Sequence, residues 1–384
     1  MTTFSGGEIV LERLMKNLKG YESYLAVPPG PFADRVIENG TAHVILTPSL
    51  QKLNRNSNKF YLLHFVRALL NTALALYKII KSKQCDAVVG NSFGVAGYTA
   101  LAAALTRKPG MWIHHHPFVK RGTLEAKAAR IFSRRLKKAA CVSDAIRNSL
   151  IKSGVKTART VTIHNGLDVH EFDPARVESG FLRTKYQFPE KLRLVGIVGV
   201  ITSWKGHLGF VESIKYVRDK GGLSDVHFLI IGDILADSKE DKHYKDNLIR
   251  FVNDHGLQDA VTFTGRLNNM VGVYRDLDIM VNNSIEPEPF GTTIYEAMAF
   301  KNAVVATHVG GSPEIVDHQV NGFLVEPDDV QGLGECLMRI LNMDAAERER
   351  LGNEAREKVI RALSVDRMEE EYRQTFDEII LGKG

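Results

Sequence analysis

Short apolar runs rich in valine and isoleucine alternate along this chain with longer stretches whose apolar residues recur at i, i+3 and i+4. The short runs are typical of buried β-strands, and the longer stretches are typical of amphipathic helices. Strands are predicted at 23–27, 42–46, 86–90, 111–115, 139–142, 160–163, 193–199, 226–231, 261–263, 278–282, 303–306 and 323–325. The clearest helices are predicted at 8–18, 60–82, 121–138, 207–219, 243–255, 291–300, 329–342 and 366–381. This strand–helix–strand alternation predicts an α/β protein with parallel sheets covered on both faces.

The alternation runs through both halves of the 384-residue chain and is interrupted by a polar, turn-rich stretch near 166–190. A chain of this length suits two domains. We therefore predict an N-terminal domain over 1–170 and a C-terminal domain over 175–364, with 365–384 packing back onto the first. Open parallel sheets bind ligands at the carboxyl ends of their strands, so we expect a binding cleft there.

The composition, 44% hydrophobic and 25% charged, is that of a globular protein and excludes a disordered or fibrous chain. The three cysteines are far apart and form no CxxC pair, which argues against a disulfide framework or a zinc site and favours a reducing cytosol. The first residues lack the pattern of a signal peptide. The apolar stretch 60–80 contains charged and polar residues and is better explained as an ordinary helix than as a membrane span.

Charge is distributed unevenly between the two halves. Residues 1–165 contain 25 Lys and Arg against 8 Asp and Glu, whereas the remainder contains 25 against 37, although the net charge is only +5. A basic half suits an anionic surface or substrate, such as lipid headgroups, a phosphorylated glycan or nucleic acid, or it is simply a solvated face. Nucleic acid is the least favoured partner, because the basic segments lack the interleaved aromatic residues that stack on bases.

The stretch 284–298, SIEPEPFGTTIYEAM, is the most informative for chemistry. Glu288 lies in a loop after a predicted strand, and a helix begins at 291–293, whose free N–H groups and dipole favour an anion. Glu296 lies about a turn and a half into that helix. Carboxylates accept hydrogen bonds from sugar hydroxyls, so this arrangement suits a phosphorylated sugar. The alternative is that Glu288 is solvated and that Glu296 caps nothing in particular.

Three further segments have the residue types of a phosphate or ligand site. Lys205 follows a glycine-containing strand end and offers a positive charge. Gly310 and Gly311, which precede Glu314, allow a ligand to approach the backbone closely. Ser5-Gly6-Gly7-Glu8 opens the first helix as a flexible loop. Each has an ordinary alternative: a surface lysine, a strand–helix turn and a helix cap.

Three consecutive histidines, His114, His115 and His116, end a predicted strand. Neighbouring strand residues point to opposite faces, so the three cannot bind one metal ion, and no metal site is expected. One imidazole facing the cleft would contact a sugar hydroxyl or the leaving group; His116 is the first choice and His114, on the same face, the second. The DxD pattern at 276–278 is interpreted as structural. The chain lacks a dinucleotide fingerprint and a Walker A sequence, which argues against a dehydrogenase or a P-loop enzyme.

Five segments occur in an order typical of one known family: IHNGLDVHEFDP, VTFTGRL, EPFGTTIYEAMAF, VATHVGGSPEIV and NGFLVEPDD. With them, nearly the whole chain resembles the retaining glycosyltransferases of group 1, also called family 4, and the E-x7-E signature of that family looks intact from Glu288 to Glu296. The resemblance implies the GT-B fold, in which two Rossmann-like domains face each other across a cleft.

The resemblance also implies an activity. A hexosyl unit would move from a nucleotide-diphosphate sugar, with a UDP-sugar favoured, to a hydroxyl of a glycan or lipid-linked acceptor in cell-envelope polysaccharide or lipopolysaccharide synthesis. Glu288 would contact the donor sugar and Glu296 the ribose, while Lys205 would neutralise the diphosphate, so that neither a metal nor another cofactor is needed. The other donor-binding residues that it implies are Gly6, Gly7, Asn165, Gly265, Arg266, Phe290, Gly291, Thr292, Thr293, Gly311 and Glu314.

The chain departs from the family pattern at two places. Val200 stands where the family has an arginine five residues before the lysine, so one diphosphate cation is missing unless Arg266 or another base replaces it. The family also has a strand directly before the Gly-Gly loop, whereas this sequence begins almost at that loop. We expect either a true start upstream or a first sheet that lacks a central strand and is destabilised, and we favour a shortened or misassigned start.

The acceptor is expected to engage the basic domain. The segment 119–138 places eight basic residues around an amphipathic helix that suits an anionic membrane, although it also suits a helix that only covers the first sheet. We therefore expect a cytoplasmic protein, peripheral on the inner face of the cell membrane. Two other functions stay open: a nucleotide-sugar epimerase of the same fold, and a non-catalytic protein that binds anionic glycans.

Overall fold

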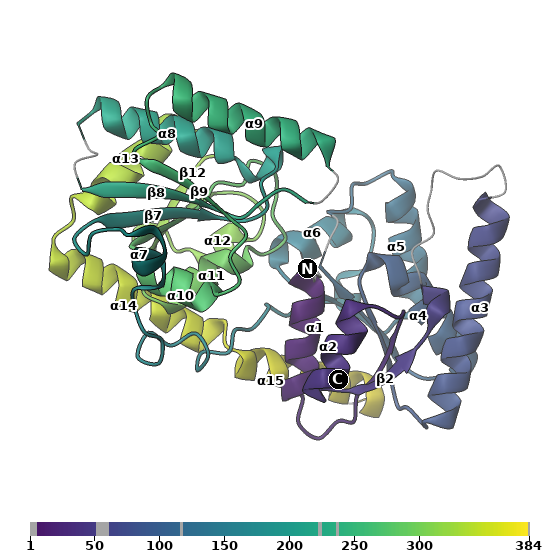
Figure 1. Cartoon of the computed structure of the whole chain (residues 1–384). Coiled ribbons are helices and arrows are strands. Elements are labelled where there is room, and N and C mark those ends of the chain that lie inside the picture. The colour runs from purple at the N-terminus through teal and green to yellow at the C-terminus, as the bar shows by residue number, and fades with distance from the viewer. Residues whose placement is uncertain (1–5, 51–60, 116–117, 222–224, 236–237, 383–384) are drawn as a thin grey trace. The chain divides into compact units, whose positions relative to one another are not determined.

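The computed structural model describes residues 6–50, 61–115, 118–221, 225–235 and 238–382 (Figure 1). The chain forms two compact units. The N-terminal unit consists of Met1–Gly166 together with Val365–Gly384, and the C-terminal unit consists of Leu167–Ser364. Each unit is a parallel α/β structure, so the predicted fold class is confirmed.

The C-terminal unit contains a six-stranded parallel sheet in the order β12-β11-β10-β7-β8-β9. Its strands are β7 (Arg193–Val198), β8 (Val226–Ile231), β9 (Val261–Gly265), β10 (Ile279–Asn282), β11 (Ala303–Thr307) and β12 (Phe323–Val325). Strands β7 to β9 extend the sheet in one direction and β10 to β12 extend it in the other. The order therefore reverses between β7 and β10, which is the place where open parallel sheets bind ligands.

Helices cover both faces of this sheet (Figure 1). They are α7 (Phe181–Tyr186), α8 (His207–Asp219), α9 (Lys239–Asp254), α10 (Met270–Asp276), α11 (Thr292–Ala299), α12 (Ser312–Ile315), α13 (Val330–Leu341) and α14 (Ala345–Ala362), with the 3-10 turn η3 (Ser203–Lys205). The core joins alternate residues of β7 and β8, such as Val195 and Phe228, to Phe210 and Ile214 of α8. All six residues of β8 are buried, as expected for a central parallel strand.

The N-terminal unit contains two separate parallel sheets. Strand β1 (Tyr24–Val27) pairs with β2 (His43–Leu46), while β3 (Val88–Asn91), β4 (Gly110–His114), β5 (Lys138–Cys141) and β6 (Thr160–Thr162) form the second sheet in chain order. The helices are α1 (Gly6–Asn17), α2 (Pro31–Asn39), α3 (Tyr61–Ser82), α4 (Phe93–Thr106), α5 (Leu124–Arg135), α6 (Asp144–Lys152) and α15 (Val365–Leu381), with the 3-10 turns η1 (Pro48–Leu50) and η2 (Thr157–Arg159). Within the described residues no strand joins the two sheets.

Helix α15 packs into the core of the N-terminal unit, although α14, which precedes it, belongs to the other unit. Its apolar residues Tyr372 and Phe376 share a buried cluster with Val10 of α1 and Met111 of β4. The backbone N–H of Gly166 donates a hydrogen bond to the sulfur of Met368 at 3.1 Å. The last helix is therefore part of the first unit's hydrophobic core.

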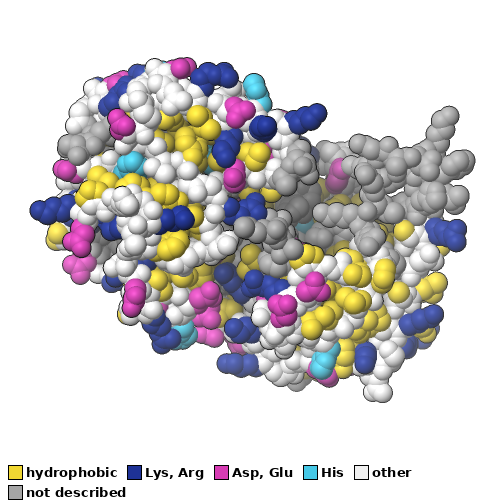
Figure 2. Space-filling model, in the orientation of Figure 1, with side chains coloured by type: hydrophobic (Ala, Val, Ile, Leu, Met, Phe, Trp, Pro, Cys, Tyr) yellow, Lys and Arg dark blue, Asp and Glu magenta, His cyan; other side chains and the backbone are white. Residues whose placement is uncertain are grey.

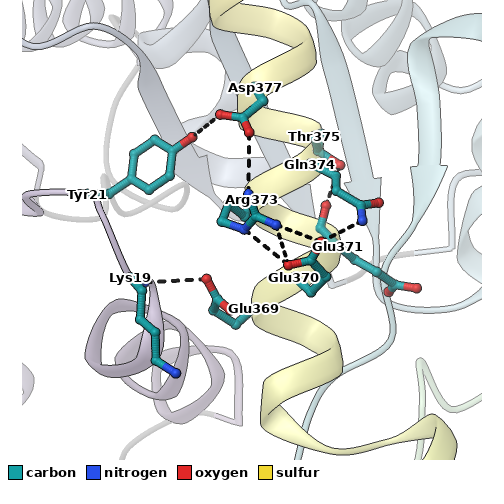
Figure 3. A network of polar contacts seen from close by, with 9 residues as sticks. All are labelled: Lys19, Tyr21, Glu369, Glu370, Glu371, Arg373, Gln374, Thr375 and Asp377. Carbon is teal, nitrogen blue, oxygen red and sulfur yellow. Dashed lines mark hydrogen bonds and ion pairs between the residues drawn. The ribbon is translucent and has the colours of Figure 1, made fainter.

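Polar contacts fix the same helix along its length (Figure 3). The hydroxyl of Tyr21 donates to Asp377 at 2.7 Å, and the backbone N–H of Lys19 donates to Glu369 at 3.4 Å. Arg373 bridges Glu370, at 2.6 Å, and Asp377, at 3.6 Å. Burial and the hydrogen bond to Asp377 raise the pKa of Tyr21 to about 12.

Every strand predicted from the apolar runs is present, and the differences lie at element ends. The helix predicted at 121–138 spans only Leu124–Arg135, because Gly122 has a positive φ of 89° and the side chain of Thr123 caps the helix by accepting from the Ala126 N–H. The helix predicted at 243–255 begins earlier, at Lys239, where Ser238 is the cap. Capping by local side chains therefore decided boundaries that the apolar spacing left open.

Candidate functional site

Two loops meet at the carboxyl ends of β7 and β10, where the strand order of the C-terminal unit reverses. The loop after β7 contains η3, and the loop after β10 runs from Asn283 to Gly291. The backbone N–H of Ile285 donates to the Trp204 carbonyl at 2.8 Å, and the side chain of Asn283 donates to the Gly206 carbonyl at 2.8 Å. Gly206 has a φ of 68°, and a Cβ atom there would overlap the Asn283 carbonyl. This glycine therefore lets the two loops come together.

Lys205 and Glu288 form an ion pair where these loops meet. The Lys205 Nζ lies 2.5 Å from Glu288 Oε1, and the two side chains are only 14% and 12% exposed. The second oxygen, Oε2, accepts hydrogen bonds from Asn282 Nδ2 and from Ser284 Oγ, each at 3.0 Å. Glu288 is thus a buried carboxylate with three partners and not a solvated side chain.

The electrostatics of this group follow from its partners. Burial by itself would raise the pKa of Glu288, but the charge and hydrogen bond of Lys205, together with the donors Asn282 and Ser284, hold that pKa below its ordinary value. The Lys205 ammonium also lies 4.4 Å from the centre of the Trp204 ring, a cation–π contact. Glu288 is therefore ionised at neutral pH, with both oxygens oriented.

Helix α11 begins directly after this loop. Gly291, with a φ of 72°, is its N-cap and provides no capping side chain, so the first N–H groups at Thr292 and Thr293 have no cap from the preceding side chain. The amide of Asn282 links the two elements, because its Nδ2 lies 3.4 Å from Thr293 Oγ1 as well as 3.0 Å from Glu288. Asn282 is not among the residues predicted from the sequence, because its place at the end of β10 was the only available signal.

Glu296 of α11 and Phe290, which precedes the helix, both contact residues of the C-terminal unit. Glu296 accepts a hydrogen bond from the buried Tyr274 hydroxyl at 3.0 Å. Phe290 is only 2% exposed and packs on Tyr295, with ring centres 5.6 Å apart. The side chain of Phe290 therefore anchors the loop in the core.

Gly310 and Gly311 pack directly against the backbone of the Glu288 loop. The Gly311 N–H donates to the Glu288 carbonyl at 2.9 Å. A Cβ atom at Gly311 would lie 2.6 Å from the Pro289 carbonyl oxygen, and one at Gly310, where φ is 62°, would overlap the backbone of Glu288. Both glycines are required by this close approach, and Glu314 follows them in α12. The structure thus brings Lys205, Glu288, Thr293 and Gly311 together.

Gly265 ends β9 and Arg266 follows it at the same edge of the sheet, but their contacts are with other residues. Gly265 has a φ of 64° and forms an isolated β-bridge with Gly232. Arg266 is exposed. The hydrogen bond from Lys245 is the main cause that lowers the pKa of Asp233, and the charge of Arg266 adds a smaller contribution. Val200 lies in the loop after β7 and is partly buried.

The remaining predicted residues belong to the N-terminal unit. Gly6 and Gly7 begin α1, and the Gly7 carbonyl accepts from Asn91 Nδ2 at 3.1 Å. The other side-chain atom of Asn91, Oδ1, lies 2.7 Å from His115 Nε2, and a Cβ atom at Gly7 would lie 3.3 Å from the same imidazole. The Gly-Gly segment therefore packs against His115.

The other two histidines differ from His115. His116 lies outside the described residues. His114 is fully buried beside Trp112 and Phe93, with ring centres 4.6 and 6.1 Å away, so its imidazole is not at the surface. Asn165 is buried next to the boundary between the units.

The DxD pattern has the structural role expected from the sequence. Both oxygens of Asp276 accept backbone N–H groups, from Gly180 and Leu182 at 2.6 Å each. Asp278 accepts the N–H of Leu194 at 2.8 Å.

Within the described ranges, His, Cys, Asp and Glu side chains form no group of three or more that could hold a metal ion. None of the helices described here combines the length and the apolar character that a membrane span needs.

Comparison with known proteins gives matches over both units. Residues 4–171 match the family model of glycosyltransferase family 4, and residues 179–358 match that of the glycosyl transferases of group 1. The chain is 22% identical over 327 residues to the UDP-Gal:alpha-D-GlcNAc-diphosphoundecaprenol alpha-1,3-galactosyltransferase of Escherichia coli, covering 82% of this chain and 81% of that protein. It is 24% identical to the capsular polysaccharide biosynthesis glycosyltransferase CapM of Staphylococcus aureus, over 62% of this chain and 60% of CapM.

Solved structures resemble both units at once. A glycosyltransferase from Rickettsia africae matches with a TM-score of 0.86 and 25% identity, covering 100% of this chain and 97% of that one. Anabaena Alr3699/HepE in complex with UDP and glucose matches with a TM-score of 0.77 and 20% identity, covering 97% and 96%. At that identity, the likeness to HepE concerns the fold alone.

Proposed function

Because this chain belongs to the group 1 or family 4 glycosyltransferases, we propose that it transfers a hexosyl unit from a nucleotide-diphosphate sugar to an acceptor hydroxyl, with retention of the anomeric configuration. The fold is GT-B, with two Rossmann-like units. The observation that carries the proposal is the buried Lys205–Glu288 pair beside the first turn of α11. It combines a cation, an oriented carboxylate and free backbone N–H groups, which are the partners that a sugar diphosphate needs.

We propose the following roles for these groups. The Lys205 ammonium and the N–H groups of Thr292 and Thr293 bind the diphosphate and stabilise the charge that develops as it leaves, in place of a divalent ion. Glu288 accepts hydrogen bonds from hydroxyls of the donor sugar, and Glu296 accepts them from the ribose. The acceptor oxygen attacks from the face that the diphosphate leaves, so no protein nucleophile is required.

A UDP-sugar is the proposed donor. The relative from Escherichia coli is named for UDP-Gal, and the HepE structure contains UDP. The same relative acts on a diphosphoundecaprenol lipid by its name, and CapM is named for capsular polysaccharide. These names support a glycan or lipid-linked acceptor in cell-envelope polysaccharide or lipopolysaccharide synthesis.

Exposed apolar and basic side chains on α3 and α5 of the N-terminal unit support a membrane-bound acceptor. Figure 2 shows hydrophobic and basic side chains mixed on one side of that unit. Helix α4 contacts both α3 and α5. Leu70 and Leu74 of α3 are 50% and 53% exposed, and Leu124 and Ile131 of α5 are 74% and 58% exposed. Exposed basic residues flank them on the same two helices: Arg67, Lys78, Lys81, Lys127, Arg130, Arg134 and Arg135. Cationic side chains around apolar ones suit an anionic lipid surface, so we propose peripheral attachment to the inner face of the cell membrane.

The activity is tested with UDP-glucose, UDP-galactose and their N-acetylated forms, using donor hydrolysis or transfer to a diphosphoundecaprenol sugar. Lys205→Ala and Glu288→Gln should each lower kcat by about 10²–10³-fold, while the exposed Lys215→Ala should leave it unchanged. Turnover that persists in EDTA supports the metal-independent mechanism. Equal rates in the wild type and both site variants would remove the assignment, and an epimerised free nucleotide sugar as product would favour an epimerase.

The membrane proposal is tested by co-sedimentation with vesicles. The vesicles contain about one anionic lipid in three. Binding to them should fall steeply above about 0.5 M salt, where charges are screened. Leu124→Ser with Ile131→Ser should weaken binding at low salt. Equal binding to zwitterionic vesicles, or no binding, would contradict the proposal.

A further inference from the structure

A cavity lies at the end of the C-terminal sheet opposite the Lys205–Glu288 pair. It has a volume of about 390 Å³ and is lined by residues at the amino ends of β7, β10 and β11. Arg193 is the first residue of β7 and Asp278 directly precedes β10, whereas Lys205 and Glu288 follow the carboxyl ends of these strands. The cavity is therefore separate from the candidate donor site.

Basic side chains predominate in its lining. Five of them, Arg183, Arg193, Arg275, Lys301 and Arg348, face three acidic ones, Asp276, Asp278 and Glu349. Asp276 is occupied by two backbone N–H groups, from Gly180 and Leu182. Asp278 accepts the Leu194 N–H and lies 4.0 Å from Arg183. Desolvation raises the pKa of Asp278, and the Leu194 N–H, followed by the guanidinium groups of Arg183, Arg193 and Arg348, only partly offsets that rise.

Three of the arginines are held in place by backbone carbonyls. Arg183 Nη1 donates to the carbonyls of Pro189 and Leu192, at 2.7 and 3.0 Å, and Arg275 Nε donates to that of Val177 at 3.1 Å. Arg348 Nη1 donates to the carbonyl of Met343. Each of these bonds uses one nitrogen of a guanidinium group that carries five N–H donors, so further donors are left for a ligand.

Arg193 differs from the other three. Its Nη1 is buried and has no hydrogen-bond partner among the described residues. Buried polar groups in native proteins are almost always paired, and a charged donor without a partner is especially unfavourable. Arg193 thus lines the cavity near Asp278, and one of its guanidinium nitrogens, Nη1, lacks an acceptor within the described residues.

We propose that this cavity binds a small phosphorylated ligand, whose phosphate oxygens accept hydrogen bonds from Arg193 and from the neighbouring arginines. A planar guanidinium group matches two phosphate oxygens at once, and a cluster of such groups is typical of phosphate recognition. The volume lies within the range of small-molecule sites. The ligand binds at the end of the sheet remote from Lys205, so it does not compete with the nucleotide sugar.

The probes are inorganic phosphate and glucose 6-phosphate, and the measurement is isothermal titration calorimetry on the full chain, with and without saturating UDP. Arg193→Gln and Arg348→Gln should each weaken binding by about tenfold or more. Arg250→Gln, which changes an exposed arginine on α9, and Lys205→Ala should bind as the wild type does. Each variant is first compared with the wild type in its melting temperature in phosphate-free buffer.

Three outcomes would overturn the proposal: no phosphate binding by the wild type, binding abolished by Lys205→Ala or by UDP, or unchanged binding in both arginine variants. If Arg193→Gln does not fold, Arg348→Gln decides the question, because its side chain lies on α14 outside the sheet. Loss of UDP binding and turnover, with phosphate binding intact, would instead count only against the proposed transferase function.

Discussion

Removing the ammonium of Lys205 while keeping its alkyl chain tests the central electrostatic claim of the site. Lys205→Met leaves Glu288, whose side chain is 12% exposed, with only the neutral donors Asn282 and Ser284. Breaking a buried ion pair from one side costs about 3–5 kcal/mol, because the remaining charge is buried without compensation. Two hydrogen bonds remain to the carboxylate, so we expect the lower end, about 3 kcal/mol.

The pH dependence of that loss has a defined sign. In the wild type the pKa of Glu288 is below its ordinary value of 4.5, so its contribution to stability is present above that pH and is lost as the pH falls through the folded-state pKa. Without Lys205 only burial and neutral donors act, and we expect the pKa to rise above 4.5. In the variant, the charged Glu288 carboxylate lowers the free energy of unfolding at neutral pH. This penalty becomes smaller as the pH falls and the carboxylate is protonated. The deficit of Lys205→Met should therefore be smaller at about pH 5 than at about pH 7.5.

Urea unfolding measures these free energies. Trp112 and Trp204 are the two tryptophans, so a Trp112→Phe background makes Trp204 fluorescence report on the C-terminal unit. The double variant Lys205→Met with Glu288→Gln should recover most of the loss, because it leaves no buried charge. A loss below about 1 kcal/mol that is independent of pH would refute the reasoning, because that is the value of an exposed ion pair.

Three further predictions concern other contacts. Gly311→Ala should lower kcat/KM by about 100-fold in the transfer assay, because its Cβ would lie 2.6 Å from the Pro289 carbonyl and displace the Glu288 loop; wild-type activity would show that this approach can relax. Tyr21→Phe should cost about 1 kcal/mol in chemical unfolding at neutral pH. The wild type should lose stability between pH 10 and about 12, because the pKa of Tyr21 is raised in the folded state, and the Tyr21→Phe variant should not show this loss. An alkaline stability profile identical to that of the wild type would contradict this. Asn91→Ala removes the donor to the Gly7 carbonyl and should raise the KM for the donor several-fold with a small change in melting temperature, whereas a change in melting temperature alone would indicate a structural role.

The strands were predictable from the sequence because a parallel sheet covered on both faces requires uninterrupted apolar runs. The segment VHFLII of β8 is such a run, and all six residues are buried. The proposed donor loops were also predictable, since Glu288 and Lys205 lie in the loops that follow β10 and β7, whose carboxyl ends meet at one edge of the sheet.

Contacts that depend on side-chain direction were not predictable. The alternation of a strand places His114 and His115 on opposite faces of the sheet. Only the tertiary structure shows that Asn91 and Gly7 contact His115. The link from Asn282 to both Glu288 and Thr293 likewise depends on how a loop returns over the strand end. The arginine-lined cavity draws on residues from 183 to 348, a separation over which no sequence pattern operates.

The position of α15 has a consequence for how the chain is made. The C-terminal unit is continuous in sequence, so a ribosome releases all of it before the last helix. Val10 and Met111 emerge early, yet their apolar neighbours Tyr372 and Phe376 are synthesised only after the whole C-terminal unit. During translation, therefore, the later-made unit is the first whose segments are all available to fold, while the earlier one keeps an open apolar surface until α15 has been made.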